Sequence, residues 1–227
     1  MFLARLFQSS IGQKILMGAT GVLLFLFVFF HMVGNLQVFV GAETLNNYGR
    51  LLRTSPELLW VIRIGLLATV ALHIYSAIVL ALHNRASRPV DYADKKSLKA
   101  TLASRTMMVS GGIVLAFIVF HIFHFTTHSV FPEYADYKTF VKGEEVHDIY
   151  RMVVAGFQKP AVSIFYVLSV GLLCFHLSHG AQSMFRSLGL NTPAYAPLQS
   201  VFAKAASAVI FAGMAAVPAA VLLGWIR

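Results

Sequence analysis

Five long apolar stretches limit what this 227-residue chain can fold into. A helix needs about 20 residues to cross a hydrocarbon core about 30 Å thick, and each stretch is long enough. The chain is 58% hydrophobic and only 12% charged, with a mean hydropathy of +0.72, which lies outside the range of soluble domains. We therefore expect an all-α integral membrane protein with a single transmembrane domain over residues 1–227, its helices near 14–40, 57–83, 105–129, 158–187 and 200–226.

Basic residues predict the orientation of these helices. By the positive-inside rule, the connection between the second and third helices lies in the cytoplasm because it carries Arg85, Arg88, Lys95, Lys96, Lys99 and Arg105. The N-terminus, with Arg5 and Lys14, then lies inside as well, and the 128–160 connection becomes an exposed outer loop. The excess of basic residues therefore indicates how the chain is oriented in the membrane rather than nucleic-acid binding. The first stretch is too long for a signal peptide and lacks a cleavage site, so we expect a retained helix.

Four histidines lie inside four different apolar stretches, namely His31, His73, His121 and His176. An ionisable residue at bilayer depth is costly and marks a candidate functional site. One such histidine could simply form a hydrogen bond to a neighbouring helix. Four of them in one chain of this size suggest two haems, each with two histidine ligands.

The positions of these histidines along their helices suggest how they pair. Counted at 1.5 Å per residue from the nearest basic residue at the cytoplasmic end, His31 and His121 lie roughly 24–25 Å deep. His73 and His176 lie roughly 15–18 Å deep. We therefore predict that the first and third helices bind an outer haem and that the second and fourth bind an inner one, with the first four helices forming a bundle around two stacked haems.

A short repeat supports this pairing. Thr20-Gly21 precedes His31 with the same spacing as Ser110-Gly111 precedes His121. The hydroxyl residues precede the histidines by eleven residues and the glycines by ten, which is about three helical turns. Each glycine therefore lies roughly one haem level below its histidine, where the other macrocycle could approach the backbone. Helix packing through small residues is the alternative explanation.

Other histidines leave alternatives open. His124 lies one turn above His121 and could be the outer ligand instead, although the repeat favours His121. His179 lies one turn below His176 and could contact a haem propionate or a quinone, or could be an ordinary interfacial residue. His128, His83 and His147 are expected at or beyond the interfaces, where a quinone or proton role is open for His128.

Three sequence segments resemble one family. They are SSIGQKILMGATGVLLFLFVFFHMVGNL (residues 9–36), NRASRP (84–89) and HLSHGAQSMFRSLGLNTP (176–193). They resemble the cytochrome b558 family, the five-helix, di-haem, single-polypeptide membrane anchors of succinate dehydrogenases and fumarate reductases. The resemblance spans nearly the whole chain. It implies the same ligand pairs as the spacing, His31 with His121 for the distal haem and His73 with His176 for the proximal one.

The resemblance also implies a function. Such a subunit anchors a flavoprotein and an iron–sulfur protein on the cytoplasmic face of the bacterial inner membrane. It carries electrons between the iron–sulfur subunit and a membrane quinone, which we expect to be menaquinone, and it has no dicarboxylate site of its own. The sequence contains neither a flavin-binding fingerprint nor a cysteine cluster. The direction of turnover and the oligomeric state are left open.

Basic residues near the helix ends are candidate partners of the haem propionates, because buried carboxylates need pairing. The context of Arg151 resembles a family arginine before the fourth helix, which assigns it to the outer haem. At the inner haem the candidates are Lys14, Arg105, Arg186 and His179. Cys174 stands where some fumarate reductases of this family have a glutamate that serves proton movement, so that proton path is not expected here.

Two other classes of protein fit part of the sequence. One is the haem-b subunit of another respiratory complex, such as a hydrogenase or formate dehydrogenase. A quinol-oxidising cytochrome b has two ligands about 13–14 residues apart on one helix, which no helix here shows. The other class is a transporter with metal-binding or proton-relaying histidines, but all nine acidic residues lie in loops or at helix ends.

Overall fold

The computed structural model describes residues 7–87 and 105–227. Within these ranges five helices are long and apolar enough to cross a membrane, which confirms the all-α membrane fold. They are α2 (Ser10–Asn35, continued by the 3-10 helix η1, Leu36–Phe39), α4 (Pro56–Ala86), α6 (Met107–Phe125), α8 (Pro160–Ser187) and α9 (Ala196–Leu222). The basic residues Arg5, Arg88, Lys95, Lys96 and Lys99 lie outside the described residues.

Local capping explains where the helices begin and end. The Ser9 side chain accepts the Gly12 N–H at 3.0 Å, so α2 begins four residues earlier than its apolar stretch indicates. At the other end of the fold, α6 ends at Phe125 rather than 129, because His128 has a positive φ of 57° and cannot continue a helix. Pro56 and Pro160 each occupy the first position of their helix, where a missing N–H costs nothing.

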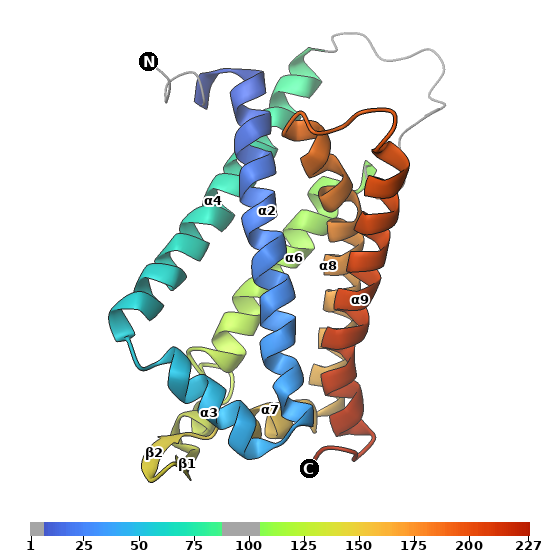
Figure 1. The fold of residues 1–227 in the computed structure, drawn as a ribbon. Helices are drawn as coiled ribbons and strands as arrows, with labels where there is room; N and C mark the ends of the chain where they lie inside the picture. Colours follow the sequence, from blue (N-terminus) through green and yellow to red (C-terminus); the bar gives the residue numbers. More distant parts are fainter. Residues whose placement is uncertain (1–6, 88–104) are drawn as a thin grey trace.

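The helices do not pack equally (Figure 1). The closest packing is between α8 and α9 and between α2 and α4, followed by α2 with α8 and α6 with α8. In contrast, α2 with α6, and α4 with α8, make little or no close backbone approach in the described residues. The fifth helix is not outside the bundle, because α9 buries Ala203, Ser207 and Ile210 against its neighbours.

Short elements close one end of the bundle, which we call the hairpin end (Figure 1). They are α3 (Ala42–Leu52), the 3-10 helix η2 (Pro132–Asp136), the antiparallel pair β1 (Lys138–Val141) and β2 (Glu144–His147), and α7 (Ile149–Phe157). We call the opposite end, where Lys14, Arg85, Arg105 and Arg186 lie, the basic end.

The expectation of a simply exposed loop over 128–160 was wrong for α7. Charged residues flank this segment, but the helix itself buries Met152, Val153, Val154 and Phe157 against the bundle. The helix α7 is only nine residues long and lies beside charged residues, so the sequence did not indicate a separate helix there. The hairpin end is thus a packed cap on the bundle.

Asn46 joins α3 to this cap. It is buried, donates to Asp148 Oδ1 at 3.0 Å and accepts the Tyr150 N–H at 3.0 Å. Asp148 in turn accepts the Arg151 N–H at 2.9 Å and so caps α7. One amide therefore fixes both α3 and the beginning of α7.

Replacing Asn46 is expected to loosen the hairpin end. In Asn46→Ala the Asp148 carboxylate and the Tyr150 N–H lose a partner in a buried setting, which costs about 1–3 kcal/mol. The thermal unfolding midpoint in detergent should fall, and amide exchange of α7 should accelerate. Glu144→Ala is the control, because it removes only the exposed ion pair to Arg50, worth about 0–1 kcal/mol. Equal stability of the two variants would contradict this account.

Candidate functional site

His31 and His121 face each other across the bundle. Their ring centroids are 5.7 Å apart and the rings are nearly perpendicular, at 85°. His31 also stacks on Phe27 at 5.4 Å, and His121 is in contact with the ring of Phe117. Two imidazoles from α2 and α6 are thus held side by side in an apolar part of the bundle.

This spacing fits two ligands of one metal ion. An imidazole nitrogen binds a first-row metal at about 2 Å, so two imidazoles on opposite sides of one ion have their centres about 6 Å apart. The backbones of α2 and α6 stay apart, so the two rings meet without direct helix packing. α4 and α8 likewise make little or no close backbone approach among the described residues. The residues present therefore fit a planar haem held between paired histidines.

His73 and His176 form the second pair. His73 on α4 and His176 on α8 lie close enough to interact electrostatically. Each ring nitrogen Nδ1 contacts a hydroxyl on a neighbouring helix, His73 with Thr20 Oγ1 at 3.1 Å and His176 with Ser110 Oγ at 3.2 Å. Both rings are therefore held from the side of Nδ1.

The two glycines of the sequence repeat lie beside these rings. A Cβ atom at Gly21 would be 3.7 Å from Cε1 of His73, and one at Gly111 would be 3.4 Å from Cε1 of His176. The repeat on α2 and α6 thus brings a hydroxyl and a glycine to each histidine of the second pair. The repeat indicated a matched role for the two glycines but did not reveal that they lie beside these imidazoles.

His124 lies in a different setting from His121. It is fully buried, and its Nδ1 is 2.8 Å from the hydroxyl of Tyr166, which is also 3.4 Å from Nδ1 of His121. Its Nε2 has no hydrogen-bond partner among the described residues. Phe125 stacks on its ring at 3.9 Å. His124 therefore faces an aromatic cluster, whereas His121 faces His31.

The candidate propionate partners are spread over both ends of the bundle. Lys14, Arg105 and Arg186 are exposed at the basic end, and His179 Nε2 contacts Ser183 Oγ at 3.1 Å on its own helix. At the hairpin end the Arg151 guanidinium lies 4.3 Å from the centre of the Tyr137 ring.

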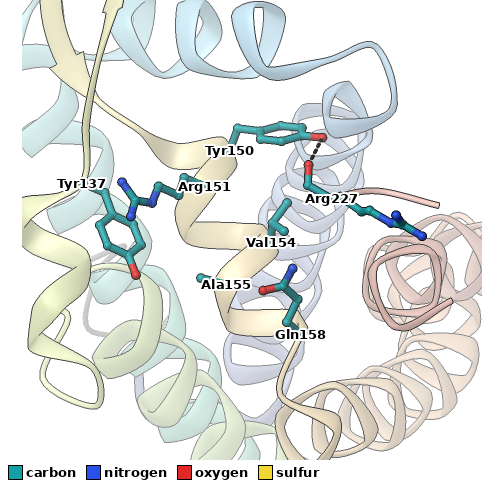
Figure 2. Close-up of a pocket in the computed structure, with 7 residues that line it drawn as sticks. All are labelled: Tyr137, Tyr150, Arg151, Val154, Ala155, Gln158 and Arg227. Carbon is teal, nitrogen blue, oxygen red and sulfur yellow. Dashed lines mark hydrogen bonds between the residues drawn. The ribbon is translucent and has the colours of Figure 1, made fainter. Parts of the chain in front are cut away.

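A cavity at the hairpin end was not expected from the sequence. It has a volume of about 430 Å³ and is lined by Tyr137, Tyr150, Arg151, Val154, Ala155, Gln158 and Arg227. Figure 2 shows that the guanidinium groups of Arg151 and Arg227 point to opposite sides of α7, so they do not converge on one ligand. The Tyr150 hydroxyl donates to the Arg227 carbonyl at 3.3 Å, which joins α7 to the segment after α9.

His128 and His147 stack on each other beyond the membrane-spanning helices, with ring centroids 5.2 Å apart. His147 Nε2 also contacts the Met152 sulfur at 3.5 Å. Burial and the nearby Arg53 guanidinium lower the pKa of both histidines below the usual 6.5. The β-hairpin is therefore docked through two imidazoles that favour the neutral form.

Lower pH is expected to weaken this docking. When the hairpin opens, its histidines regain a pKa near 6.5 and take up protons before the docked ones do, so stability is full above about pH 6.5 and falls below it. Amide exchange of residues 138–147, corrected for intrinsic rates, should accelerate from about pH 7.5 to about pH 5.5. In His147→Phe, which keeps an aromatic ring without a titrating group, this acceleration should be smaller. Equal pH dependence in both proteins would refute the explanation.

Together these observations define a class, an all-α membrane protein in which His31 meets His121 between two helices and His73 lies near His176 between two others. Residues 92–213 match the family described as succinate dehydrogenase/fumarate reductase transmembrane subunit, and this match covers more than half of the chain. The chain belongs to this family, whose members bind haem b and anchor the complex in the membrane. No significant match was found among curated proteins or among solved structures.

Proposed function

We propose that this chain is the di-haem, cytochrome b558-type anchor of a succinate:quinone oxidoreductase, and that it carries electrons between the iron–sulfur subunit and membrane menaquinone. The observation that supports this most directly is the edge-to-face contact of His31 and His121, with a second histidine pair on the other two helices. Two haem b groups, when bound, supply one-electron chemistry through their irons. His31 with His121, and His73 with His176, would each hold one of these groups.

The two ends of the bundle have different roles in this proposal. The basic end faces the cytoplasm, with the N-terminus on the same side, and receives the iron–sulfur and flavoprotein subunits. Its exposed Lys14, Arg105 and Arg186, with His179, neutralise the propionates of the inner haem. Arg151 serves the outer haem from the hairpin end. In this proposal succinate and fumarate react in the flavoprotein subunit.

The direct test is to isolate the complex from its native membrane through a tag on this chain. Succinate should reduce the cytochrome, which gives a b-type α-band in the visible spectrum, and the co-purified chains should include a flavoprotein and an iron–sulfur protein. A complex that responds to hydrogen or formate instead would replace the dehydrogenase assignment. A protein without a reduced b-type band would exclude the electron-carrying role.

We further propose that quinone reacts at the hairpin end. Two haems are needed only if electrons must reach the far side of the membrane, because a quinone beside the inner haem could otherwise be served by that haem alone. The candidate residues there are His128, which is half-buried, and Glu43, which is exposed at the start of α3. The alternative site lies near His179 and Arg186 at the basic end.

Quinone turnover in paired variants separates the two sites. We expect His128→Ala and Glu43→Gln to lower quinone reduction about 10-fold or more by removing groups that bind or protonate quinone, with haem content unchanged. His179→Ala and Arg186→Gln are the matched set at the basic end, and their quinone turnover, normalised to bound haem, should fall less than in the first set. Normal turnover in the first set and loss in the second would place the quinone site at the basic end.

A further inference from the structure

Thr20 and Ser110 occupy equivalent places in the two halves of the bundle. Thr20 lies on α2 and contacts His73 of α4, and Ser110 lies on α6 and contacts His176 of α8. Both hydroxyls are buried and each is followed by a glycine that lies against the same imidazole. Two independent helix pairs therefore repeat one arrangement.

Hydrogen-bond direction follows from what else each hydroxyl contacts. A hydroxyl has one proton to donate, and Thr20 Oγ1 donates it to the Leu16 carbonyl at 2.7 Å. Its oxygen is then an acceptor toward His73, so Nδ1 must carry the hydrogen. Ser110 Oγ likewise donates to the Met107 carbonyl at 3.1 Å. In both imidazoles this leaves Nε2 without a proton and with its lone pair free.

We propose that Thr20 and Ser110 are positioning residues, which hold His73 and His176 as the Nδ1-protonated tautomer with Nε2 ready to bind the inner haem. The inference rests on the proposed function, since it concerns how the chain prepares its own ligands. A hydrogen bond at the outer nitrogen of a ligating imidazole fixes its tautomer and orientation and raises its basicity. Gly21 and Gly111 lie next to the carbon between the two nitrogens of His73 and His176, respectively.

The test compares Thr20→Val, which keeps the shape but removes the hydroxyl, with Thr20→Ser, which keeps the hydroxyl. Haem loss is measured as transfer from the intact complex to an excess of a haem-free acceptor protein, and the two midpoint potentials are measured by redox titration. In Thr20→Val and in Ser110→Ala, one haem should be lost about 10–100 times faster, and its potential should rise as the ligand becomes less basic. The other haem should be unchanged, and Thr20→Ser should restore normal behaviour.

Thr69→Val is the control, because the Thr69 hydroxyl donates to the Gly65 carbonyl of its own helix at 2.7 Å. The proposal would be overturned if Thr20→Val and Ser110→Ala both showed the same haem loss and potentials as Thr69→Val. It would also be overturned if the two haems changed equally. If Thr20→Val fails to assemble, Ser110→Ala and Thr20→Ser decide the question. An unaltered complex that holds no haem would instead refute the proposed function, so the two failures are distinct.

Discussion

His73→Ala and His176→Ala are each expected to remove about half of the bound haem, because a bis-histidine haem that loses one ligand is no longer held on both sides. The remaining haem should be the one between His31 and His121, whose rings meet on different helices, α2 and α6. Haem per chain is measured from the pyridine haemochrome spectrum and protein content. Electron transfer from succinate to quinone should be lost in both variants.

The matched variants His31→Ala and His121→Ala should remove the other half of the bound haem and retain the haem of His73 and His176. The unaltered protein should show a low-spin spectrum, since in the proposed pairing each haem would be held by two histidines. One haem per chain in the unaltered protein, or a high-spin signal, would refute the pairing. Loss of the same haem in all four variants would show that the two pairs do not form separate sites.

The second large effect is a difference in haem retention between variants of His121 and His124. His121→Ala should lose the haem of the His31 pair, whereas His124→Ala should keep both haems. The structure supports this expectation because His121 faces His31 at 5.7 Å, while His124 is held by Tyr166 at 2.8 Å within an aromatic cluster. Haem content and the low-spin spectrum of both variants are the measurements.

Tyr166→Phe is a useful companion to these two variants. It removes the hydroxyl shared by His121 and His124 but keeps the ring, so it should change the outer haem's potential while retaining the haem. The opposite result in the histidine variants, with haem lost only in His124→Ala, would move the outer ligand up one turn of α6.

The membrane-spanning helices could be predicted from the sequence because their signal is the length of each apolar stretch, which needs no knowledge of neighbours. The ends of these helices could not be predicted, because they depend on local details. Examples are the hydrogen bond to the Ser9 side chain and the positive φ of His128. The helix α7 escaped prediction for a similar reason. Five of its nine residues are buried, and they are buried only because α3, α8 and α9 surround them.

The four central histidines could also be selected from the sequence as candidate ligands, because an ionisable residue within an apolar stretch is unusual. Their hydroxyl partners could not, since Thr20 and Ser110 are ordinary small residues in membrane helices until a second helix brings an imidazole against them. The repeat of a hydroxyl residue before a glycine was the one available signal. It indicated a matched role at these positions without indicating the partner.

The arrangement of the hydroxyl contacts has a consequence for biogenesis. Both contacts lie within a helix pair, α2 with α4 and α6 with α8, whereas both proposed haems span the two pairs. A nascent chain that has inserted only α2 and α4 therefore presents one ligand for each haem and can complete neither. Insertion of α6 completes the His31 and His121 site, and only α8 completes the other. Loading of the second haem would thus mark the moment at which all four ligand-bearing helices have been inserted, with only α9 to follow.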